Sequence, residues 1–417
     1  MMYFWLPQMK HLLTLIITAT TLVVFADSTR PALLQQLKPY LSPKVWETPQ
    51  PPEINRDILI KSLNAARKYY LAQQRRDGNF TYALDIASGD TSNDDNQVRQ
   101  AGALWGLVRL HQAFPTDETR KAIIQCLDFF SKNTRQLDSG ETVFVYPGDS
   151  TVKTGTIALL MLAILDFQDE PSLDDALKQH YRRLLFAYIA FLRTMEMDDG
   201  SWARGFELAI NFRDPDASPY YDGEALLAYA KAARSLKRKD LLFRINDAFP
   251  KLIQKYTVDA WAPEGNDELT KGFFQWGAMA CEQYVCANWT PHAELAADAA
   301  IALALWQIHA NQLESRKGNT AYAIEGIAAA IHVAQLTKRP DVADGLAAVA
   351  RRVIARLTLC QFQGPFHAMN PRFTSLKNPV HAAFGGITDT PNTTVVRIDI
   401  VQHQVHAILL LLDTLFK

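Results

Sequence analysis

The feature that most constrains this fold is a repeat of apolar segments with helical periodicity, which runs from Arg56 to the C-terminus. In each segment apolar residues recur every three or four positions, the spacing that lines one face of a helix. Turn residues close each segment, and the alternation typical of strands is nearly absent. We therefore predict an all-α protein. Its twelve helices are expected near residues 56–75, 94–114, 117–135, 151–168, 173–197, 219–236, 239–256, 270–287, 292–312, 319–337, 341–361 and 398–416.

Two kinds of segment alternate along the chain. The odd ones are amphipathic and carry many charges, as in Asp57–Leu63, which suits helices with one face in water. The even ones are rich in alanine, glycine and leucine, as in Ala101–Gly106 and Gly155–Leu160, and helices that are apolar all round are buried. Six outer helices around six inner ones make an (α/α)6 toroid, in which helix hairpins bury apolar surface against their neighbours. We therefore expect residues 56–417 to form a single toroid domain.

Glycine-x-aromatic turns follow three of the outer segments: Gln74–Phe80, Asp198–Trp202 and Gln361–Phe366. They resemble the Gln-x-Gly-x-Trp turns of terpenoid-cyclase and prenyltransferase toroids, over a repeat that covers most of the chain. This resemblance implies the same six-hairpin α/α-toroid fold. The Asp-x-Asp-Asp motif of the cyclases is missing, and Ser92–Asp95 is the nearest approach to it. A terpenoid-cyclase-like enzyme is therefore kept only as a second alternative.

The N-terminus predicts export. Lys10 precedes an apolar run over residues 12–25 that ends in Val24-Phe25-Ala26, with small residues where a signal peptidase reads. We expect residues 1–26 to be a signal peptide, which would place the protein in the periplasm or outside the cell. The alternative is an uncleaved membrane anchor, which would be its only link to a membrane. Residues 27–55 are rich in proline and are predicted to form an extended arm.

Charge and cysteine content limit the partners. Lys and Arg number 43 against 44 Asp and Glu, with no basic stripe, so nucleic acid is not expected as a partner. No Cys/His spacing resembles a zinc site and no glycine-rich phosphate loop occurs, so no metal or cofactor is predicted. In an exported chain the four cysteines could pair. Cys126 and Cys360 could do so if their helices touch, whereas Cys281 and Cys286 lie on different faces of one helix.

The polar residues of the inner helices predict one binding site. In a toroid of antiparallel hairpins all inner helices run the same way, so their N-termini open at one rim, and their polar and aromatic residues cluster there. The loop 385–390 is expected to form part of this mouth. The predicted substrate-binding residues are Arg99, Arg397, Lys153, Asp95, Tyr220, Tyr221, Gln275, Trp276, Tyr322 and Gln402, and the predicted catalytic ones are His403, Asp399, Glu224 and Glu325.

Several of these residues also have a structural interpretation. Asp95 could serve as a helix N-cap or first-turn anion. Arg99, Glu224 and Glu325 could form Glu–Arg pairs across the barrel, since a charge among alanines and glycines needs a partner. In the functional interpretation the aromatic residues stack on sugar rings, and three basic residues hold a substrate carboxylate. Those three are Arg99, Lys153 and Arg397.

The last helix carries the sharpest motif, Arg397, Asp399 and His403. Asp399 and His403 are four residues apart, so they share a helix face, and the carboxylate could orient the imidazole as a general base. A contact that only fixes the last helix is the structural alternative. This ending resembles the C-terminal segment of glucuronyl epimerases over roughly twenty residues, with Ile398 where those enzymes carry an aromatic residue. The resemblance implies action on uronic acids in a polysaccharide.

Together these observations favour an exported carbohydrate-active enzyme. Its substrate would be a polysaccharide or oligosaccharide containing uronic acid, and its reaction hydrolysis, elimination or epimerisation, among which the sequence does not choose. The alternative from another class is a non-catalytic glycan- or peptide-binding protein of the cell envelope, with aromatics at the mouth and every buried charge paired structurally.

Overall fold

The computed structural model describes residues 51–417 except positions 93, 139, 263 and 319. The predicted signal peptide and nearly all of the proline-rich arm lie outside the described residues. Within the described part, no helix combines the length and the hydropathy that a bilayer span requires.

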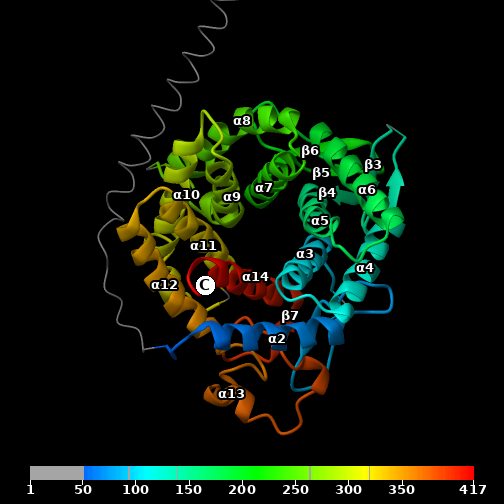
Figure 1. The fold of residues 1–417 in the computed structure, drawn as a ribbon. Coiled ribbons are helices and arrows are strands. Elements are labelled where there is room, and N and C mark those ends of the chain that lie inside the picture. Colours follow the sequence, from blue (N-terminus) through cyan, green and yellow to red (C-terminus); the bar gives the residue numbers. More distant parts are fainter. Residues whose placement is uncertain (1–50, 93, 139, 263, 319) are drawn as a thin grey trace, which may run out of the picture.

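Helices form two concentric rings (Figure 1). The outer ring consists of α2 (Arg56–Gln73), α4 (Asp117–Lys132), α6 (Asp175–Thr194), α8 (Lys239–Ile253), α10 (Ala293–His309) and α12 (Pro340–Thr358). The inner ring consists of α3 (Gln97–Ala113), α5 (Thr154–Phe167), α7 (Pro219–Ser235), α9 (Glu268–Ala287), α11 (Ala321–Leu336) and α14 (Ile398–Thr414). The predicted (α/α)6 toroid is thereby confirmed, including the alternation of outer and inner helices.

The inner helices are buried because their side chains are apolar on every face. In α5 every residue except Asp166 is buried. The outer helix α4, in contrast, buries one face and exposes most of its charged residues. Small residues allow the inner helices to approach closely. A Cβ at Gly223 of α7 would lie 2.6 Å from the Cβ of Trp276 on α9, so only glycine fits this contact.

The ring closes where its first and last elements meet. Helix α14 packs between α3 and α11 and against α2. Strand β1 (Ala83–Asp85) pairs with β7 (Val395–Arg397) in antiparallel register, with Ala83 opposite Arg397. This pairing fixes the backbone of Arg397 directly before the first residue of α14.

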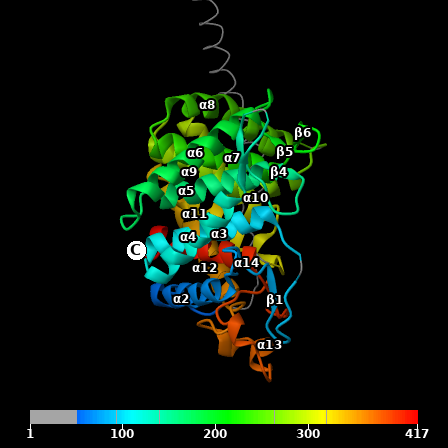
Figure 2. The same ribbon diagram turned by 90° about the vertical axis from the view of Figure 1, so that its right-hand side faces the viewer.

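Short strands occupy loops at the ends of the helices. Strand β2 (Thr134–Gln136) pairs with β3 (Thr142–Phe144), and β4 (Thr151–Lys153) pairs with β5 (Ala203–Glu207), which also pairs with β6 (Phe212–Ala217). Figure 2 shows β1, β4, β5 and β6 on one side of the toroid.

The strand pairing corrects one predicted boundary. The inner helix expected from residue 151 begins at Thr154, because Thr151–Lys153 pair with β5 instead of joining the helix.

The remaining elements are short. Helix α8 runs into a π-helical turn, Gln254–Asp259, and 3-10 turns cover Leu313–Ser315, His367–Met369 and His381–Ala383. The four-residue helix α13 (Pro371–Thr374) lies beyond α2, outside the rings, in both views (Figures 1 and 2).

The glycine-x-aromatic turns end outer helices as expected. Gly78 and Gly200 adopt left-handed conformations, with φ of 102° and 84°, and Trp202 packs edge-on against Tyr229. The third turn differs, since Gln363 takes the left-handed conformation in place of Gly364.

The thiols of all four cysteines are free, so Cys126 and Cys360 do not form a disulfide. Cys126, Cys281 and Cys360 are buried, and Cys286 is half-buried.

Candidate active site at the mouth of the toroid

A cavity of about 550 Å³ opens at the N-terminal ends of the inner helices. Most of the residues predicted from the sequence line it: Arg99, Tyr220, Tyr221, Glu224, Gln275, Trp276, Tyr322, Arg397, Asp399, Gln402 and His403. Asp389 of the loop 385–390 lines it as well, in agreement with the expectation that this loop forms part of the mouth.

Two predicted substrate-binding residues lie elsewhere. Asp95 accepts hydrogen bonds from Tyr146 (2.6 Å), Gln100 (2.8 Å) and Arg75 (3.1 Å), so it joins other segments of the protein and does not line the cavity. It is not the N-cap of α3 either, because Asn96 holds that position. Lys153 is part of β4, whose pairing with β5 keeps this residue out of the cavity lining.

His403 is held by Glu325 and not, as the sequence predicted, by Asp399. The Nδ1 of His403 lies 2.7 Å from Oε1 of Glu325, a fully buried carboxylate on the neighbouring helix α11. The other oxygen, Oε2, accepts from Gln275 (2.7 Å) and faces Nδ1 of His406 (3.0 Å). Glu325 thus stands behind the cavity wall and orients a residue that lines it.

The charge on Glu325 sets the tautomer of His403. Burial alone would raise the pKa of this carboxyl, but His403 and His406 beside it bring the pKa below its usual value. An ionised carboxylate can only accept, so Nδ1 of His403 carries the proton and donates it. The lone pair on Nε2 is then available to take a proton from a bound molecule, as a general base requires.

Asp399 has a different role because two guanidinium groups hold it. Arg397 donates to both of its oxygens, at 3.1 and 2.8 Å, and Nε of Arg99 lies 3.3 Å from Oδ2. Burial would raise the pKa of Asp399, but these partners lower it. The carboxylate therefore stays ionised and is a weak base, and its main effect is to position the two arginines in the cavity wall.

Glu224 is the opposite case, a buried acid without a charged partner. It is 3% exposed, and its Oε2 has no hydrogen-bond partner within the described part of the chain. Burial raises its pKa well above the usual value for a glutamic acid. The carboxyl group lies against Gly155, where an added Cβ would be 2.2 Å from Oε2 and would force the carboxyl group to move. Glu224 is thus a neutral acid at the cavity, able to donate a proton.

Basic side chains outnumber acidic ones in the lining. The acids are Glu224, Asp389 and Asp399, and the bases are Arg99, Arg204, Lys271, Arg316 and Arg397. The whole chain has a net charge of −1, so this excess of basic groups is local. A cavity with this lining favours an anionic ligand.

Three of these basic residues were not singled out from the sequence. Arg204 lies in β5, Arg316 follows the 3-10 turn after α10, and Lys271 lies in the first turn of α9. Arg204 and Arg316 belong to loops between the rings, where no helical periodicity places them. Lys271 lies one helical turn before Gln275, which the sequence did single out. This spacing on the same helix could have indicated that Lys271 belongs to the site.

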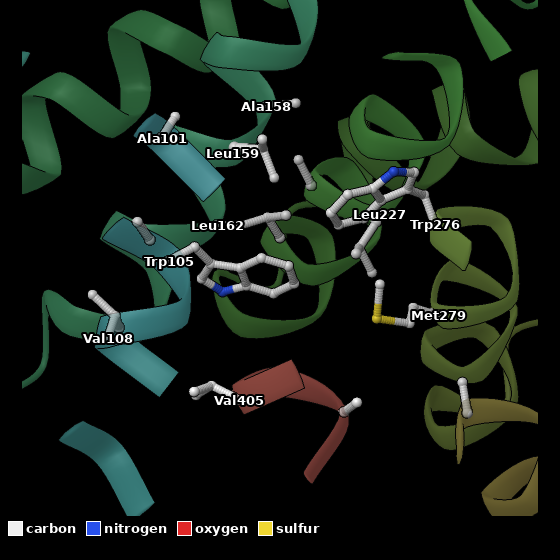
Figure 3. Packing of buried hydrophobic residues seen from close by; sticks show 14 of the residues in the cluster. Ala101, Trp105, Val108, Ala158, Leu159, Leu162, Leu227, Trp276, Met279 and Val405 are labelled. Carbon is white, nitrogen blue, oxygen red and sulfur yellow. The ribbon is translucent and has the colours of Figure 1, made fainter. Parts of the chain in front are cut away.

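Aromatic residues line part of the cavity, and one of them, Trp276, also contacts the apolar layer of the inner ring. The rings of Trp276 and Trp105 lie 6.0 Å apart, and Figure 3 shows both indoles pointing into the apolar layer between the inner helices. Trp276 and Tyr322 also flank the imidazole of His403, with ring centroids at 6.4 and 6.5 Å. Tyr220 is about half exposed at the rim. These surfaces suit the apolar faces of sugar rings.

Comparison with known proteins identifies the fold but no family. No family model matches the sequence, and no curated protein matches it either. A solved structure of D-mannose isomerase is similar to the chain, with a TM-score of 0.62 and 13% identity, over 87% of this chain and 98% of the isomerase. Cellobiose 2-epimerase from Spirochaeta thermophila is similar with a TM-score of 0.57 and 14% identity, over 85% and 96% of the two chains.

A glycoside hydrolase has the same architecture. The family 76 α-1,6-mannanase from a Salegentibacter species is similar with a TM-score of 0.58 and 11% identity, over 85% of this chain and 98% of the mannanase. Inactive variants of that enzyme have been solved with α-1,6-mannotriose and α-1,6-mannotetraose. The chain therefore has the α/α-toroid fold that sugar isomerases, sugar epimerases and mannanases share, as the resemblance to six-hairpin toroids implied.

Proposed function

We propose that this protein is a sugar-modifying enzyme, an epimerase or isomerase that transfers a proton at one carbon of an acidic saccharide. One observation carries the proposal. His403, oriented as a base by Glu325, and Glu224, a neutral acid, line the same cavity from helices on opposite sides of the inner ring, α14 and α7. A base and an acid on opposite sides of a substrate can remove a proton from one face and return one to the other.

The reaction follows from these two groups. Nε2 of His403 takes a proton from a carbon next to a carboxylate or carbonyl group, so the C–H bond breaks and an N–H bond forms. The electron pair moves onto the adjacent oxygen, where the Arg99 and Arg397 guanidinium groups stabilise the developing charge. Glu224 then gives its proton to the opposite face of the carbon, which inverts that centre, or to a neighbouring position, which isomerises the sugar.

Hydrolysis is supported less well. It would need Glu224 as the acid and Asp399 as the second carboxylate. The two arginines that lower the pKa of Asp399 make it a poor base. Elimination would use the same proton abstraction by His403 and would leave an unsaturated product.

The substrate proposal rests on the lining. The excess of basic side chains supports an anionic saccharide, and the resemblance of Arg397, Asp399 and His403 to the ending of glucuronyl epimerases supports a uronic acid. The solved sugar isomerase, epimerase and mannanase of the same fold support a carbohydrate ligand. Export through the segment 1–26 is part of the same proposal. Mature protein from its native source should then begin near Asp27, and recovery of Met1 by N-terminal sequencing would contradict cleavage.

Deuterium exchange tests the reaction. The purified protein is incubated in D2O with uronate-containing oligosaccharides and with neutral ones, and the products are followed by NMR, reducing-end assay and ultraviolet absorbance. We expect deuterium at one carbon of the uronate series, without new reducing ends or absorbance. New reducing ends without exchange would show a hydrolase, and absorbance would show a lyase. Tight binding of the same oligosaccharides without any of these changes would show a glycan-binding protein.

A further inference from the structure

A second group of reactive side chains lies at the other end of the inner ring. Glu282 and Cys286, one helical turn apart near the C-terminal end of α9, face His332 on α11. One ligand atom of each residue lies within 4.8 Å of the others, and Nδ1 of His332 is 2.5 Å from Oε1 of Glu282. The proposed sugar chemistry uses none of the three.

We propose that Glu282, Cys286 and His332 bind one divalent transition-metal ion of the zinc type. A thiolate, an imidazole and a carboxylate are the three ligand kinds that zinc accepts, and the sulfur ligand disfavours magnesium and calcium. This inference does not depend on the proposed sugar chemistry.

The spacing is compatible with a metal site. With metal–ligand distances of about 2.0–2.3 Å, the ligands of a tetrahedral zinc ion lie roughly 3.3–3.8 Å apart. The three atoms, all within 4.8 Å of one another, reach this spacing by side-chain movements on the order of an ångström. Glu282 and His332 also line a cavity of about 320 Å³, which leaves room for water as a fourth ligand.

Two basic residues of α7 face this group and compete with a cation. Burial raises the pKa of the Cys286 thiol and Arg234 lowers it, but the Arg234 side chain is exposed and donates to Gln283 at 3.0 Å. The ammonium group of Lys231 is held 2.6 Å from both oxygens of Asp166.

The ion would link α9 and α11, the two helices whose side chains contact the proposed general base, His403. Gln275 and Glu325, which meet near the mouth, lie seven residues before Glu282 and His332 on the same two helices. The metal would thus fix α9 against α11 two turns farther along. It would lie at the end of the ring opposite to the sugar cavity.

Titration of the full chain tests the site. Protein stripped with a chelator is titrated with Zn²⁺ by calorimetry and with Co²⁺ by absorbance. We expect one equivalent of either ion and a thiolate-to-cobalt charge-transfer band that Cys286→Ser removes. His332→Ala should weaken zinc binding at least tenfold, whereas Gln283→Ala on the same helix as Cys286 should not change it. Absence of the band in the unmodified chain, or zinc affinity unaffected by both ligand substitutions, would overturn the proposal.

A second measurement needs no variant. Cys286 is the one thiol of the four that is not buried, so a maleimide should modify it first in the native protein. Bound Zn²⁺ should slow this modification at least tenfold, as followed by mass spectrometry of the peptide that contains Cys286. An unchanged rate at saturating Zn²⁺ would contradict thiolate ligation.

Discussion

The two ends of the inner ring are built from the same six helices but differ in whether their ionisable side chains are paired. At the C-terminal end, Asp166 is neutralised by Lys231 and accepts from Trp105 at 2.8 Å. At the N-terminal end, one oxygen of Glu224 has no hydrogen-bond partner among the residues that the structure describes, and His403 lines the cavity. Paired groups hold the ring together, and groups left available can act on a ligand. Substitutions at the two ends should therefore have opposite effects on stability and activity.

Asp166→Asn should cause the largest loss of stability. Asp166 and Lys231 are 10% and 16% exposed, so the substitution leaves a nearly buried ammonium group without its carboxylate. Removing one partner of a buried ion pair costs about 3–5 kcal/mol of unfolding free energy. Urea denaturation should show this loss, while deuterium exchange into substrate by the folded fraction stays unchanged. Asp169→Asn, at an exposed position on the same end, is the control and should change neither quantity.

His403→Ala should reverse this pattern. Loss of a general base typically lowers the rate about a hundredfold or more. The side chain is 20% exposed and lines a cavity, and Gln275 and His406 still hold Glu325 after its removal, so the loss of stability should be smaller than for Asp166→Asn. The comparison variant is His406→Ala, which removes the other imidazole on Glu325 from a fully buried position and should lower stability more. If His403→Ala lowers the melting temperature but keeps full activity, the residue is structural.

Glu224→Gln removes the acidic proton of this side chain and keeps its shape. The substitution keeps the side chain in the space that Gly155 leaves open, but removes the proton that Glu224 donates, so the rate should fall about a hundredfold. Stability should respond to pH. The pKa of Glu224 in the folded protein is raised above its unfolded value of about 4.3. The stabilisation that comes from its proton is therefore fully present below that pH.

This contribution is lost as the pH rises through the folded pKa of Glu224. A glutamine side chain at this position is neutral and does not titrate. The melting temperature of Glu224→Gln, relative to the unmodified protein, should therefore rise with pH. A difference that stays constant from about pH 5 to about pH 9 would mean that Glu224 is not held neutral by burial.

Local patterns in the sequence predicted the fold, whereas contacts between distant segments decided the site. The alternation of charged and alanine-rich helices is local, so it predicted both rings and the mouth. His403 and Glu325 are 78 residues apart, and sequence spacing alone favoured Asp399, which shares a helix with His403. Asp399 is instead bound by Arg397 and Arg99, an arrangement fixed when β7 pairs with β1 and α14 packs against α3.

Two further predicted residues lie away from the cavity lining for the same physical reason. Lys153 was placed at the mouth because residues 151–168 were expected to form an inner helix, but Thr151–Lys153 pair instead with a strand some fifty residues later in the chain. Asp95 has the sequence context of a helix start, but Tyr146 and Arg75 hold its carboxylate from other loops. Periodicity within one helix carries no information about such partners.

The smallest effect is expected at the rim, for Arg204→Ala. Arg204 lines the cavity, but its side chain is 52% exposed and lies beside Asp214 and Asp216. Water and these carboxylates screen its attraction for an anionic sugar, so its contribution should be about 0.2–1 kcal/mol, or less than tenfold in affinity. We expect a higher KM for uronate oligosaccharides at unchanged kcat, with the difference shrinking as salt is added.

Arg213→Ala is the matched control for this prediction. Arg213 lies on β6 of the same hairpin but outside the cavity lining, and its guanidinium group donates to the backbone of Thr194. An equal rise in KM for neutral oligosaccharides would show that Arg204 shapes the hairpin and does not attract the acidic group of the substrate.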